Sequence, residues 1–227
     1  MDKKILVAIP ARKGSKRIKW KNLYEFQGKP LVVHPMETAL ALNFPNKRII
    51  VSTDSPEIGK LAVERGIEYI DRPTELAEDL SPDIDWLRHA LDYLKQKDGY
   101  EPDYILHIRA TTPQRDPAIV EKLVTEFIEN GEADALRTVQ RVDVVIEKCV
   151  WIGPDGYMKD YFGNNLRDIN LCTQNFHPPY KANGYVDVFK NMDFTGKIDI
   201  FHNLKVIPYL TDPVMDIDTY KDFEQKK

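Results

Sequence analysis

Residues 4–22 read KILVAIPARKGSKRIKWKN, and this stretch decides the fold. Its first part, Ile5 to Ile9, is a continuous apolar run that ends at Pro10, which is typical of a parallel strand buried on both faces. The loop that follows, Ala11 to Lys21, contains six cations within ten residues. We expect this loop to lie at the carboxyl end of a central strand, where open α/β sheets bind their ligands.

Apolar runs and helical spacings alternate along the chain after this loop. The predicted helices are a segment beginning near Pro30, Pro56 to Arg65, Ile84 to Lys95 and Pro117 to Asn130. The predicted strands are Arg48 to Ser52, Ile67 to Ile70, Tyr104 to Ile108 and Ala133 to Val139. This alternation predicts an α/β fold with a three-layer, doubly wound, mostly parallel sheet of the Rossmann-like type.

The alternation stops after Val142. A Pro-Asp-Gly turn between Trp151 and Tyr157 predicts a hairpin, and we interpret residues 143–178 as an inserted segment that could form a dimer. The remaining predicted elements are strands Gly184 to Phe189 and Leu204 to Leu210 and a closing helix from Thr219 to Gln225. We therefore expect a single domain over residues 1–227 that carries one insertion.

The composition excludes several classes of protein. The 227 residues include 32 basic and 36 acidic side chains, mixed along the chain, so we expect no nucleic-acid or membrane partner. The N-terminal apolar run is too short for a signal peptide or a membrane span, and we expect a cytoplasmic protein. Cys149 and Cys172 do not form a CxxC pair, which argues against a disulfide framework and a zinc site.

The positive charge after the first strand favours a polyphosphate ligand. A nucleoside triphosphate carries about four negative charges, which Arg, Lys and backbone N–H groups can neutralise with charge-assisted hydrogen bonds. The loop contains neither GxxxxGK[ST] nor GxGxxG, which argues against a kinase-like NTPase and a dinucleotide dehydrogenase. The alternative is a basic loop exposed to solvent without a ligand.

Short motifs follow one another along the chain: Ala11 to Lys16 (ARKGSK) with Lys21-Asn22, Val51 to Asp54, Arg72 to Ala77 (RPTELA), Thr111 to Pro113, Asn183-Gly184 and Asp216 to Thr219 (DIDT). In this order they resemble the motifs of the acylneuraminate cytidylyltransferases, or CMP-sialic acid synthetases. The resemblance covers almost the whole chain. It implies the nucleotide-diphospho-sugar transferase fold.

The resemblance assigns nucleotide binding chiefly to the first loop. In relatives the Arg and Lys of this loop bind the triphosphate, which implies that role for Arg12 and Lys21, with Lys16 as a helper. Arg72 matches an arginine that contacts the nucleotide, and the alternative is a surface ion pair with Glu75. The nucleotide-binding residues implied in this way are Ala11, Arg12, Gly14, Ser15, Lys16, Lys21, Asn22, Arg72, and, in the base pocket, Ser81 and Asp83.

Two carboxylates near the C-terminus are the predicted metal ligands. Asp216 and Asp218 alternate along an extended segment, so both can face one side and bind Mg²⁺, and members of the family place the metal there. The ion would lower the pKa of the acceptor hydroxyl and neutralise charge on the reacting phosphate. The alternative for Asp218 is an N-cap of the following helix. The implied catalytic residues are Arg12, Lys21, Lys181, Asp216 and Asp218.

The acceptor site departs from the family's pattern. Arg109 replaces a Gln and Lys181 an Arg, and we expect the charge of Arg109 to suit a carboxylate or phosphate on the acceptor. Asp187 replaces a Tyr, and Asp83 replaces a Ser that contacts cytosine, so the base read there could be cytosine or guanine. Alternation along its strand could place His107 beneath this site. The implied substrate-binding residues are Arg109, Thr111, Lys181, Asn183 and Asp187.

We therefore expect an enzyme that transfers CMP from CTP to the hydroxyl of an acidic, sialic-acid-like nonulosonate, with Mg²⁺ as cofactor and with release of pyrophosphate. Three alternatives remain open. The donor could be GTP or another NTP, the acceptor could be 3-deoxy-octulosonate or a sugar phosphate, or the protein could bind nucleotide without turnover. The resemblance also implies a homodimer.

Overall fold

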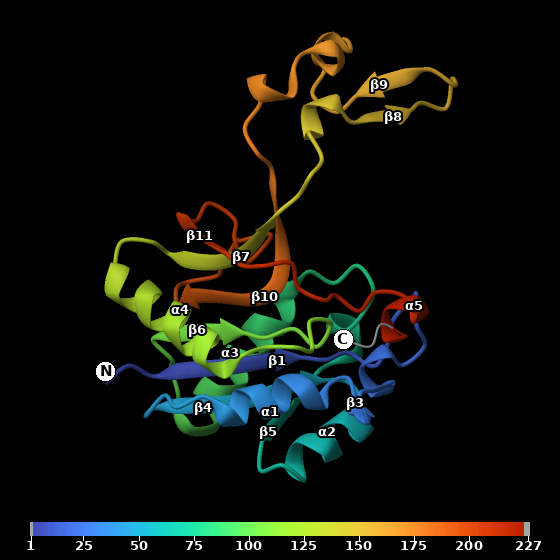
Figure 1. The fold of residues 1–227 in the computed structure, drawn as a ribbon. Helices are drawn as coiled ribbons and strands as arrows, with labels where there is room; N and C mark the ends of the chain where they lie inside the picture. The colour runs from blue at the N-terminus through green and yellow to red at the C-terminus, as the bar shows by residue number, and fades with distance from the viewer. Residues whose placement is uncertain (1, 225–227) are drawn as a thin grey trace.

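A seven-stranded sheet forms the centre of the computed structural model, which describes residues 2–224 (Figure 1). Its strands are, in spatial order, β11 (Val206–Leu210), β7 (Ala135–Arg141), β10 (Tyr180–Lys190), β6 (Tyr104–His107), β1 (Ile5–Pro10), β4 (Lys47–Thr53) and β5 (Glu68–Asp71). Neighbouring strands are parallel, except that β10 is antiparallel to both β6 and β7. The predicted mostly parallel sheet is therefore confirmed.

Helices cover both faces of the sheet because the central strand buries side chains on both sides. The helices are α1 (Val33–Ala41), α2 (Pro56–Val63), α3 (Asp83–Asp98), α4 (Pro117–Asn130) and the short α5 (Tyr220–Phe223). Ile5, Val7 and Ile9 of β1 pack in one cluster with residues of α1, α2 and α4. Leu6 and Ala8 pack in a second cluster with residues of α3, which completes the three predicted layers.

The largest local difference from the sequence prediction precedes α1. Where the sequence predicts the start of a helix near Pro30, the chain forms a hairpin of β2 (Glu25–Phe26) and β3 (Lys29–Pro30). Its turn residues Gln27 and Gly28 have φ values of 50° and 82°, the left-handed backbone that a two-residue hairpin turn requires. The helix therefore begins only at Val33.

Two later predicted elements, the strand from Gly184 and the closing helix, also differ in their bounds. β10 begins at Tyr180, before the predicted start at Gly184, and its register shifts between Ala182 and Asp187. Gly184 lies within this bulge and has a φ of 68°, a backbone conformation that residues other than glycine rarely adopt. The closing helix covers only Tyr220–Phe223, and Gln225 lies outside the described residues.

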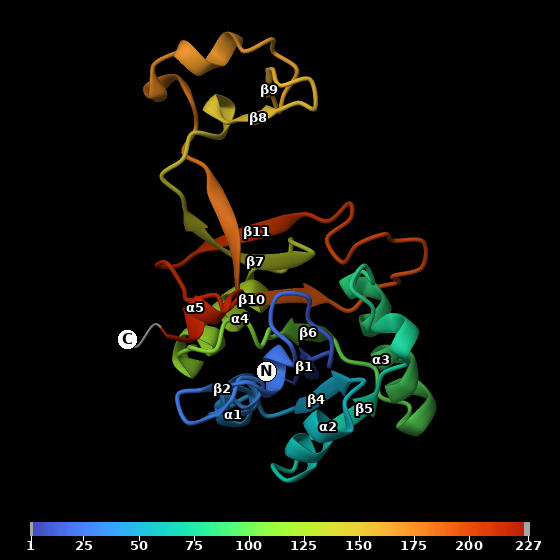
Figure 2. The same cartoon turned by 90° about the vertical axis from the view of Figure 1, so that its right-hand side faces the viewer.

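Residues 143–178 form an arm that leaves the sheet between β7 and β10 and stands away from it in both views (Figures 1 and 2). The hairpin of β8 (Val150–Ile152) and β9 (Met158–Asp160) lies in this arm, with its turn at the predicted Pro-Asp-Gly. At the base of the arm, the Val142 amide donates to the Pro179 carbonyl at 3.1 Å. None of the helices within residues 2–224 has the length and apolar composition of a membrane-spanning segment.

Candidate active site

A cavity of about 240 Å³ lies at the carboxyl ends of β1 and β6, the edge at which parallel sheets bind ligands. Its lining residues come from four separate parts of the chain: Pro10, Arg12, Gly14, Ser15, Lys21, Asn22, Arg72, Asp83, Arg109, Ala110 and Thr111. Most of these are residues that the sequence analysis assigns to nucleotide or substrate binding. Ala11 is buried beside the cavity, and its amide donates to the Ser52 carbonyl of β4.

Hydrogen bonds across the first loop fix its path over the cavity. The Asn22 side-chain amide donates to the Arg12 carbonyl at 2.8 Å, which ties the end of the loop to its beginning. The Lys13 amide donates to the Asp54 carboxylate at 2.7 Å, which attaches the loop to the end of β4. Trp20, with a φ of 56°, turns the chain into the short 3₁₀ helix that starts at Lys21. These contacts fix the path of the loop, and two of its cations, Arg12 and Lys21, line the cavity.

Carboxylates from two other segments lie against three of the loop cations. Arg12 is 2.8 Å and Lys16 is 3.5 Å from the carboxylate of Asp79. Arg17 is 2.7 Å from the carboxylate of Asp218. All of these side chains keep contact with solvent, so each pair can exchange for a stronger anion such as a phosphate.

The C-terminal carboxylates reach the same place because Ile217 anchors the segment between them. Ile217 is fully buried in a small core with Phe26 and Leu31, and its amide donates to the Thr111 carbonyl at 2.7 Å. In an extended segment the flanking residues face the opposite way, so Asp216 and Asp218 point away from this core. The Lys21 Nζ donates to the Ile217 carbonyl at 2.9 Å and to the Asp218 carboxylate at 3.2 Å.

The alternative role of Asp218 as a helix cap is not observed. Thr219 is the N-cap of α5, and Asp222 completes a capping box with it. The backbone amide of Asp218 donates to Asp222 at 2.9 Å, so the Asp218 carboxylate is free to face the loop.

The two carboxylates suit a hard cation such as Mg²⁺. Partial desolvation and the neighbouring Asp218 raise the pKa of Asp216, and both acids favour a cation between them. Within residues 2–224, no group of three or more Asp, Glu, His or Cys side chains could hold a metal ion. Mg²⁺ fits a site with two carboxylates, because it commonly keeps water ligands and takes the rest from substrate phosphates.

Arg72 is an internal residue and does not form the surface ion pair with Glu75. Its guanidinium is buried, and it donates to the Ser52 hydroxyl at 3.0 Å and to the Ser52 carbonyl at 2.6 Å. Burial lowers its pKa to about 10, so Arg72 stays a cation at neutral pH. It lies over the ring of Trp86 at the edge of the cavity.

Arg109, which the sequence analysis expects to suit an anionic group of the acceptor, lines the cavity and is paired with two carboxylates in the structure. Its guanidinium donates to Asp83 at 2.7 Å and to Asp187 at 3.4 Å, so both carboxylates balance it. Asp187 itself is 1% exposed and lies beneath the cavity, because the bulge in β10 turns it inward. It therefore supports the site from below and does not line it.

Six other predicted residues are absent from the cavity lining: Lys16, Asp216 and Asp218, whose contacts are described above, and Ser81, Asn183 and Lys181. The hydroxyl of Ser81 donates to the Glu75 carbonyl, which holds it in its own turn. Asn183 is buried, and its amide donates to the hydroxyl of Thr211 at 2.7 Å. Lys181 is exposed at the start of β10, and its positive charge lowers the pKa of Asp216 slightly against the larger effect of desolvation.

Arg115 is a residue of the site that the sequence analysis missed. Its half-buried guanidinium donates to the carbonyls of Arg109 at 2.7 Å, Gly184 at 3.0 Å and Tyr185 at 2.5 Å. It thereby joins the end of β6 to the bulge of β10. Burial lowers the pKa of Arg115 to about 9. In the sequence Arg115 is only a lone arginine two residues after the Thr-Thr-Pro motif. That position does not indicate that its hydrogen-bond partner, the Tyr185 carbonyl, lies 70 residues away in the chain.

His107 lies beneath the site, as alternation along its strand suggested. It is 1% exposed, its ring meets the ring of Trp86 edge-on, and Asp187 is 4.0 Å away. Burial holds the pKa of His107 well below its usual range, so it is neutral. Among the described residues, neither ring nitrogen has a hydrogen-bond partner.

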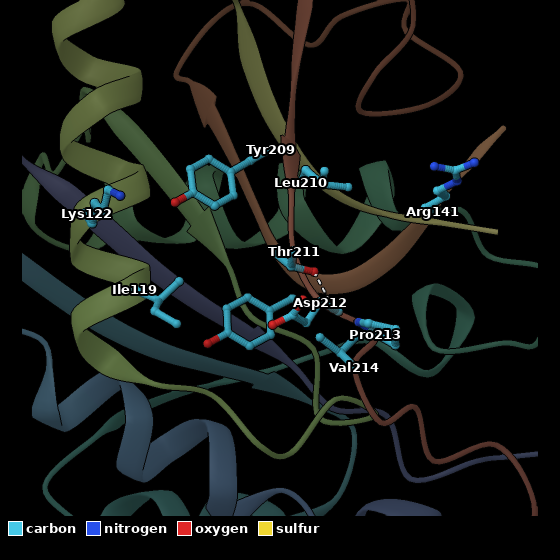
Figure 3. Close-up of a pocket in the computed structure, with 10 residues that line it drawn as sticks. Ile119, Lys122, Arg141, Tyr209, Leu210, Thr211, Asp212, Pro213 and Val214 are labelled. Atoms are coloured by element: carbon cyan, nitrogen blue, oxygen red, sulfur yellow. Dashed lines mark hydrogen bonds between the residues drawn. The ribbon is translucent and has the colours of Figure 1, made fainter. Parts of the chain in front are cut away.

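A second, larger cavity of about 670 Å³ lies between α4 and β11 (Figure 3). It is lined by Ile119, Lys122, Arg141, Tyr185, Tyr209, Leu210, Thr211, Asp212, Pro213 and Val214. None of the residues predicted for catalysis or nucleotide binding is in this lining. The smaller cavity, where the cations and carboxylates meet, is therefore the candidate active site.

Comparison with known sequences agrees with this geometry. The sequence family described as Cytidylyltransferase matches residues 6–227. The chain is 26% identical to the N-acylneuraminate cytidylyltransferase of Streptococcus agalactiae serotype V, over 97% of this chain and 52% of that protein. It is 26% identical to the pseudaminic acid cytidylyltransferase of Campylobacter jejuni serotype O:23/36, over 99% of this chain and 95% of that protein.

A third relative is the CMP-N,N'-diacetyllegionaminic acid synthase of Legionella pneumophila, 31% identical over 81% of this chain and 76% of that protein. The chain spans about half the length of the streptococcal relative, 52% of it. Among solved structures, CMP:2-keto-3-deoxy-manno-octonic acid synthetase complexed with CTP matches with a TM-score of 0.68 at 17% identity. That match covers 97% of this chain and 95% of the other, and it shows that the two proteins share a fold.

Proposed function

This chain belongs to the cytidylyltransferase family, and we propose that it transfers CMP from CTP to a hydroxyl of an acidic sugar and releases pyrophosphate. The observation that carries the proposal is the meeting of the cationic loop with the C-terminal carboxylates. Lys21 lies 3.2 Å from Asp218, although the two residues are 197 positions apart. A polyphosphate held by the loop would therefore lie beside both carboxylates.

The loop supplies the binding energy for the triphosphate in this proposal. Arg12, Lys16 and Lys21 exchange their carboxylate partners for phosphate oxygens, which form stronger charge-assisted hydrogen bonds. Arg72, which is buried and still charged, adds a fixed cation at the other side of the cavity. These groups neutralise the charge that would otherwise repel an incoming hydroxyl oxygen.

Asp216 and Asp218 would hold Mg²⁺ as the cofactor. Bound there, the ion supplies Lewis-acid chemistry that lowers the pKa of the acceptor hydroxyl and stabilises negative charge on the reacting phosphate. Lys21 donates a hydrogen bond to Asp218, and the charges of Lys21 and Lys181 both act to lower the pKa of Asp216. Both lysines therefore favour the ionised form of Asp216.

The reaction is a nucleotidyl transfer at the α-phosphorus of CTP. The acceptor oxygen forms a bond to this phosphorus and loses its proton, and the bond to the β-phosphate oxygen breaks. Pyrophosphate leaves with the electron pair of that bond. The protein contributes mainly by holding the two reactants in line and by neutralising charge in the transition state.

Acidic sugars of the nonulosonate type are the proposed acceptors. The names of the relatives refer to N-acylneuraminate, pseudaminic acid and N,N'-diacetyllegionaminic acid, which are all acids. Because Asp83 and Asp187 balance the charge of Arg109, the acid group of the acceptor is more suitably bound by Lys181, which is exposed at the start of β10 and has no carboxylate partner within salt-bridge distance among the described residues. We expect the enzyme to act in the cytoplasm, where CTP is available.

The arm is the proposed contact of a homodimer. Its exposed large apolar side chains are Val144, Ile146, Trp151, Ile152, Tyr157, Met158, Tyr161, Phe162 and Leu171. A protruding segment with so many exposed aromatic and aliphatic groups is typical of a surface that is covered in an assembly.

A pyrophosphate-release assay that crosses CTP, UTP, GTP and ATP with a panel of acidic sugars tests the function. The panel contains N-acetylneuraminic, pseudaminic, N,N'-diacetyllegionaminic and 3-deoxy-octulosonic acids, and each assay includes Mg²⁺. We expect pyrophosphate only with CTP and at least one nonulosonate. Release with GTP alone, or with no combination despite CTP binding, would contradict the proposal.

A further inference from the structure

The larger cavity between α4 and β11 has no role in the proposed reaction (Figure 3). Its volume of about 670 Å³ lies within the range of about 300–1,000 Å³ that is typical of small-molecule sites. Its lining comes from α4, β7, β10, β11 and the segment that follows β11, so several elements enclose it. A cavity of this size and construction can hold a ligand of its own.

Two cations line this cavity without a strong partner. Arg141, at the end of β7, is exposed, and no carboxylate of the described residues lies within salt-bridge distance of it. Lys122 of α4 is 3.8 Å from Glu126 on the next turn of the helix, and both side chains are exposed. Such a pair contributes little to stability and exchanges easily. Asp212 is the one carboxylate in the lining, so two cations against one acid favour an anion.

The other lining groups favour a ligand that contains a ring. The phenol oxygen of Tyr185 accepts from the Asp116 amide at 2.8 Å, so its O–H remains available as a donor. Figure 3 shows the hydroxyl of Tyr209 pointing toward α4, where Lys122 lies. Rings pack well against aromatic and aliphatic walls. Four lining residues supply the aliphatic part: Ile119, Leu210, Pro213 and Val214.

One wall of the cavity continues to the candidate metal ligands. Residues 211–214 line the cavity, and Asp216 follows two residues later. We call residues 211–217 the strap. The amides of Thr211 and Ile217 donate to backbone carbonyls of the domain at 2.9 and 2.7 Å, which fixes both ends of the strap. A ligand that packs against the strap therefore acts on the short segment that carries Asp216.

We propose that this cavity is a second ligand site, which binds a small organic anion that contains a ring, and that the strap links its occupancy to the metal ligand Asp216. Lys122 and Arg141 attract the charge of the ligand from α4 and from β7, and its ring packs against the tyrosines. The link to Asp216 rests on the proposed function, whereas the site itself does not. Acidic sugars and nucleotide sugars share this chemistry, and the experiment distinguishes them.

The test follows Tyr209 by ¹⁹F NMR in the full chain labelled with 3-fluorotyrosine. Tyr209 lines this cavity, whereas the lining of the candidate active site contains no tyrosine among the described residues. A Tyr209→Phe variant assigns its signal among the 11 tyrosines. The probes are N-acetylneuraminic acid, CMP-N-acetylneuraminic acid and, as an anion without a ring, pyrophosphate. We expect a saturable shift with at least one of the first two and about tenfold weaker binding of pyrophosphate, which cannot use the apolar walls.

Lys122→Ala/Arg141→Ala should weaken binding of the sugar probe, measured at Tyr209, about ten- to a hundredfold, because it deletes two charge-assisted contacts. The affinity for CTP should stay unchanged, since neither residue lines the candidate active site. The matched control is Lys60→Ala/Arg65→Ala, which removes one lysine and one arginine from α2 and the turn after it. The control should bind the probe as the wild type does.

A second measurement tests the link through the strap. Coupling between two sites is reciprocal, so Mg²⁺ bound at Asp216 should change the affinity of the probe at Tyr209. We expect a change of about fivefold or more in the wild type and none through the protein in Asp216→Asn. Any direct binding of Mg²⁺ to the probe is the same for both proteins, so the difference between them reports the link.

A Tyr209 signal that no sugar probe shifts, or a shift that Lys122→Ala/Arg141→Ala keeps in full, would overturn the second site. A shift that depends on protein concentration without any probe would overturn it as well, because a second copy of the chain would then fill the cavity. An equal effect of Mg²⁺ in the wild type and in Asp216→Asn would overturn the link. The proposed function fails by a different result, the absence of pyrophosphate release from CTP with every acidic sugar.

Discussion

Lys21 is the residue at which two distant parts of the chain meet. Its ammonium group contacts both the Ile217 carbonyl and the Asp218 carboxylate, and it also lines the cavity. A lysine at this position can exchange one carboxylate contact for a phosphate oxygen without leaving the site. It therefore couples nucleotide binding to the position of the carboxylate pair.

Lys21→Ala should weaken CTP binding about ten- to a hundredfold, because it deletes a charge-assisted contact to phosphate. Calorimetric titration with CTP and Mg²⁺ measures the change. Lys19→Ala is the matched control, since Lys19 lies over the Trp20 ring and not in the cavity lining. An affinity for CTP that is the same in both variants would show that Lys21 does not bind phosphate.

Asp216→Asn should lower kcat roughly a hundredfold or more and leave the affinity for CTP within a few-fold, because a metal ligand acts mainly in the transition state. The Mg²⁺ concentration at half-maximal activity should rise in the variant. Asp212→Asn removes an exposed carboxylate from the same segment and serves as the control. Normal turnover of Asp216→Asn at saturating Mg²⁺ would rule out the metal assignment.

At the scale of elements, the first loop, Ala11 to Lys21, is restrained by the turn that follows Arg72 to Ala77. Asp79 in this turn lies 2.8 Å from Arg12 and 3.5 Å from Lys16. The same cations are those proposed to bind phosphate, so Asp79 competes with the nucleotide for them. Both ion pairs are partly exposed, and each contributes little to the stability of the fold.

Asp79→Asn should therefore increase the affinity for CTP about two- to fivefold, the range expected from the loss of exposed ion pairs. The gain should shrink as salt is added, because salt screens these charges. Titrations at low and high ionic strength measure both effects. Asp85→Asn, which removes the partner of Arg88 on α3, is the control and should not change the affinity. Weaker CTP binding by Asp79→Asn would mean that Asp79 helps to shape the loop.

At the scale of the whole molecule, the arm connects β7 and β10, which are antiparallel neighbours in the sheet, and so takes the place of a hairpin turn. Arg141 of β7 pairs with Tyr180 of β10, and the next residues, Val142 and Pro179, are joined by a hydrogen bond of 3.1 Å. The ends of residues 143–178 are therefore close enough to be connected by a tight turn. The arm can be removed without stretching the sheet.

Replacing residues 143–178 with Asn-Gly should give a folded protein that stays monomeric, because a two-residue turn suits this hairpin and the exposed apolar groups are gone. Light scattering after size-exclusion chromatography measures the mass, and circular dichroism checks the fold. The full chain is the reference and should be a dimer. A shortened protein that still forms dimers would place the interface elsewhere.

Elements with strong local patterns are predicted well from this sequence. The buried run Ile5 to Ile9 and the Pro-Asp-Gly turn in the arm form the predicted strand and hairpin, because neighbouring residues contain the whole signal. The predicted start of α1 near Pro30 is wrong, because the β2–β3 hairpin precedes the helix, which begins only at Val33. Gln27 adopts a left-handed backbone conformation there. Glutamine has no strong preference for this conformation, so its presence in the sequence does not predict the turn.

The residues of the site also fall into two groups, those that local sequence predicts and those that only the folded structure reveals. The sequence indicates that the cations of the first loop bind phosphate and that Asp216 and Asp218 bind a metal, because charge and spacing are local properties. It does not indicate that Arg115 and Asp187 support the floor of the site. Their partners depend on how β6 and β10 lie side by side.

By itself the sequence determined the alternation of strands and helices, the cationic loop and the carboxylate pair, since each is set by residues within a few positions of one another. The tertiary structure decided that Lys21 meets Asp218, that Asp79 restrains Arg12, and that Arg109 is balanced by two aspartates. These contacts form between segments that only the packing of the sheet brings together. The strength of a charge depends on its partners and on its distance from water, and both are properties of the folded chain.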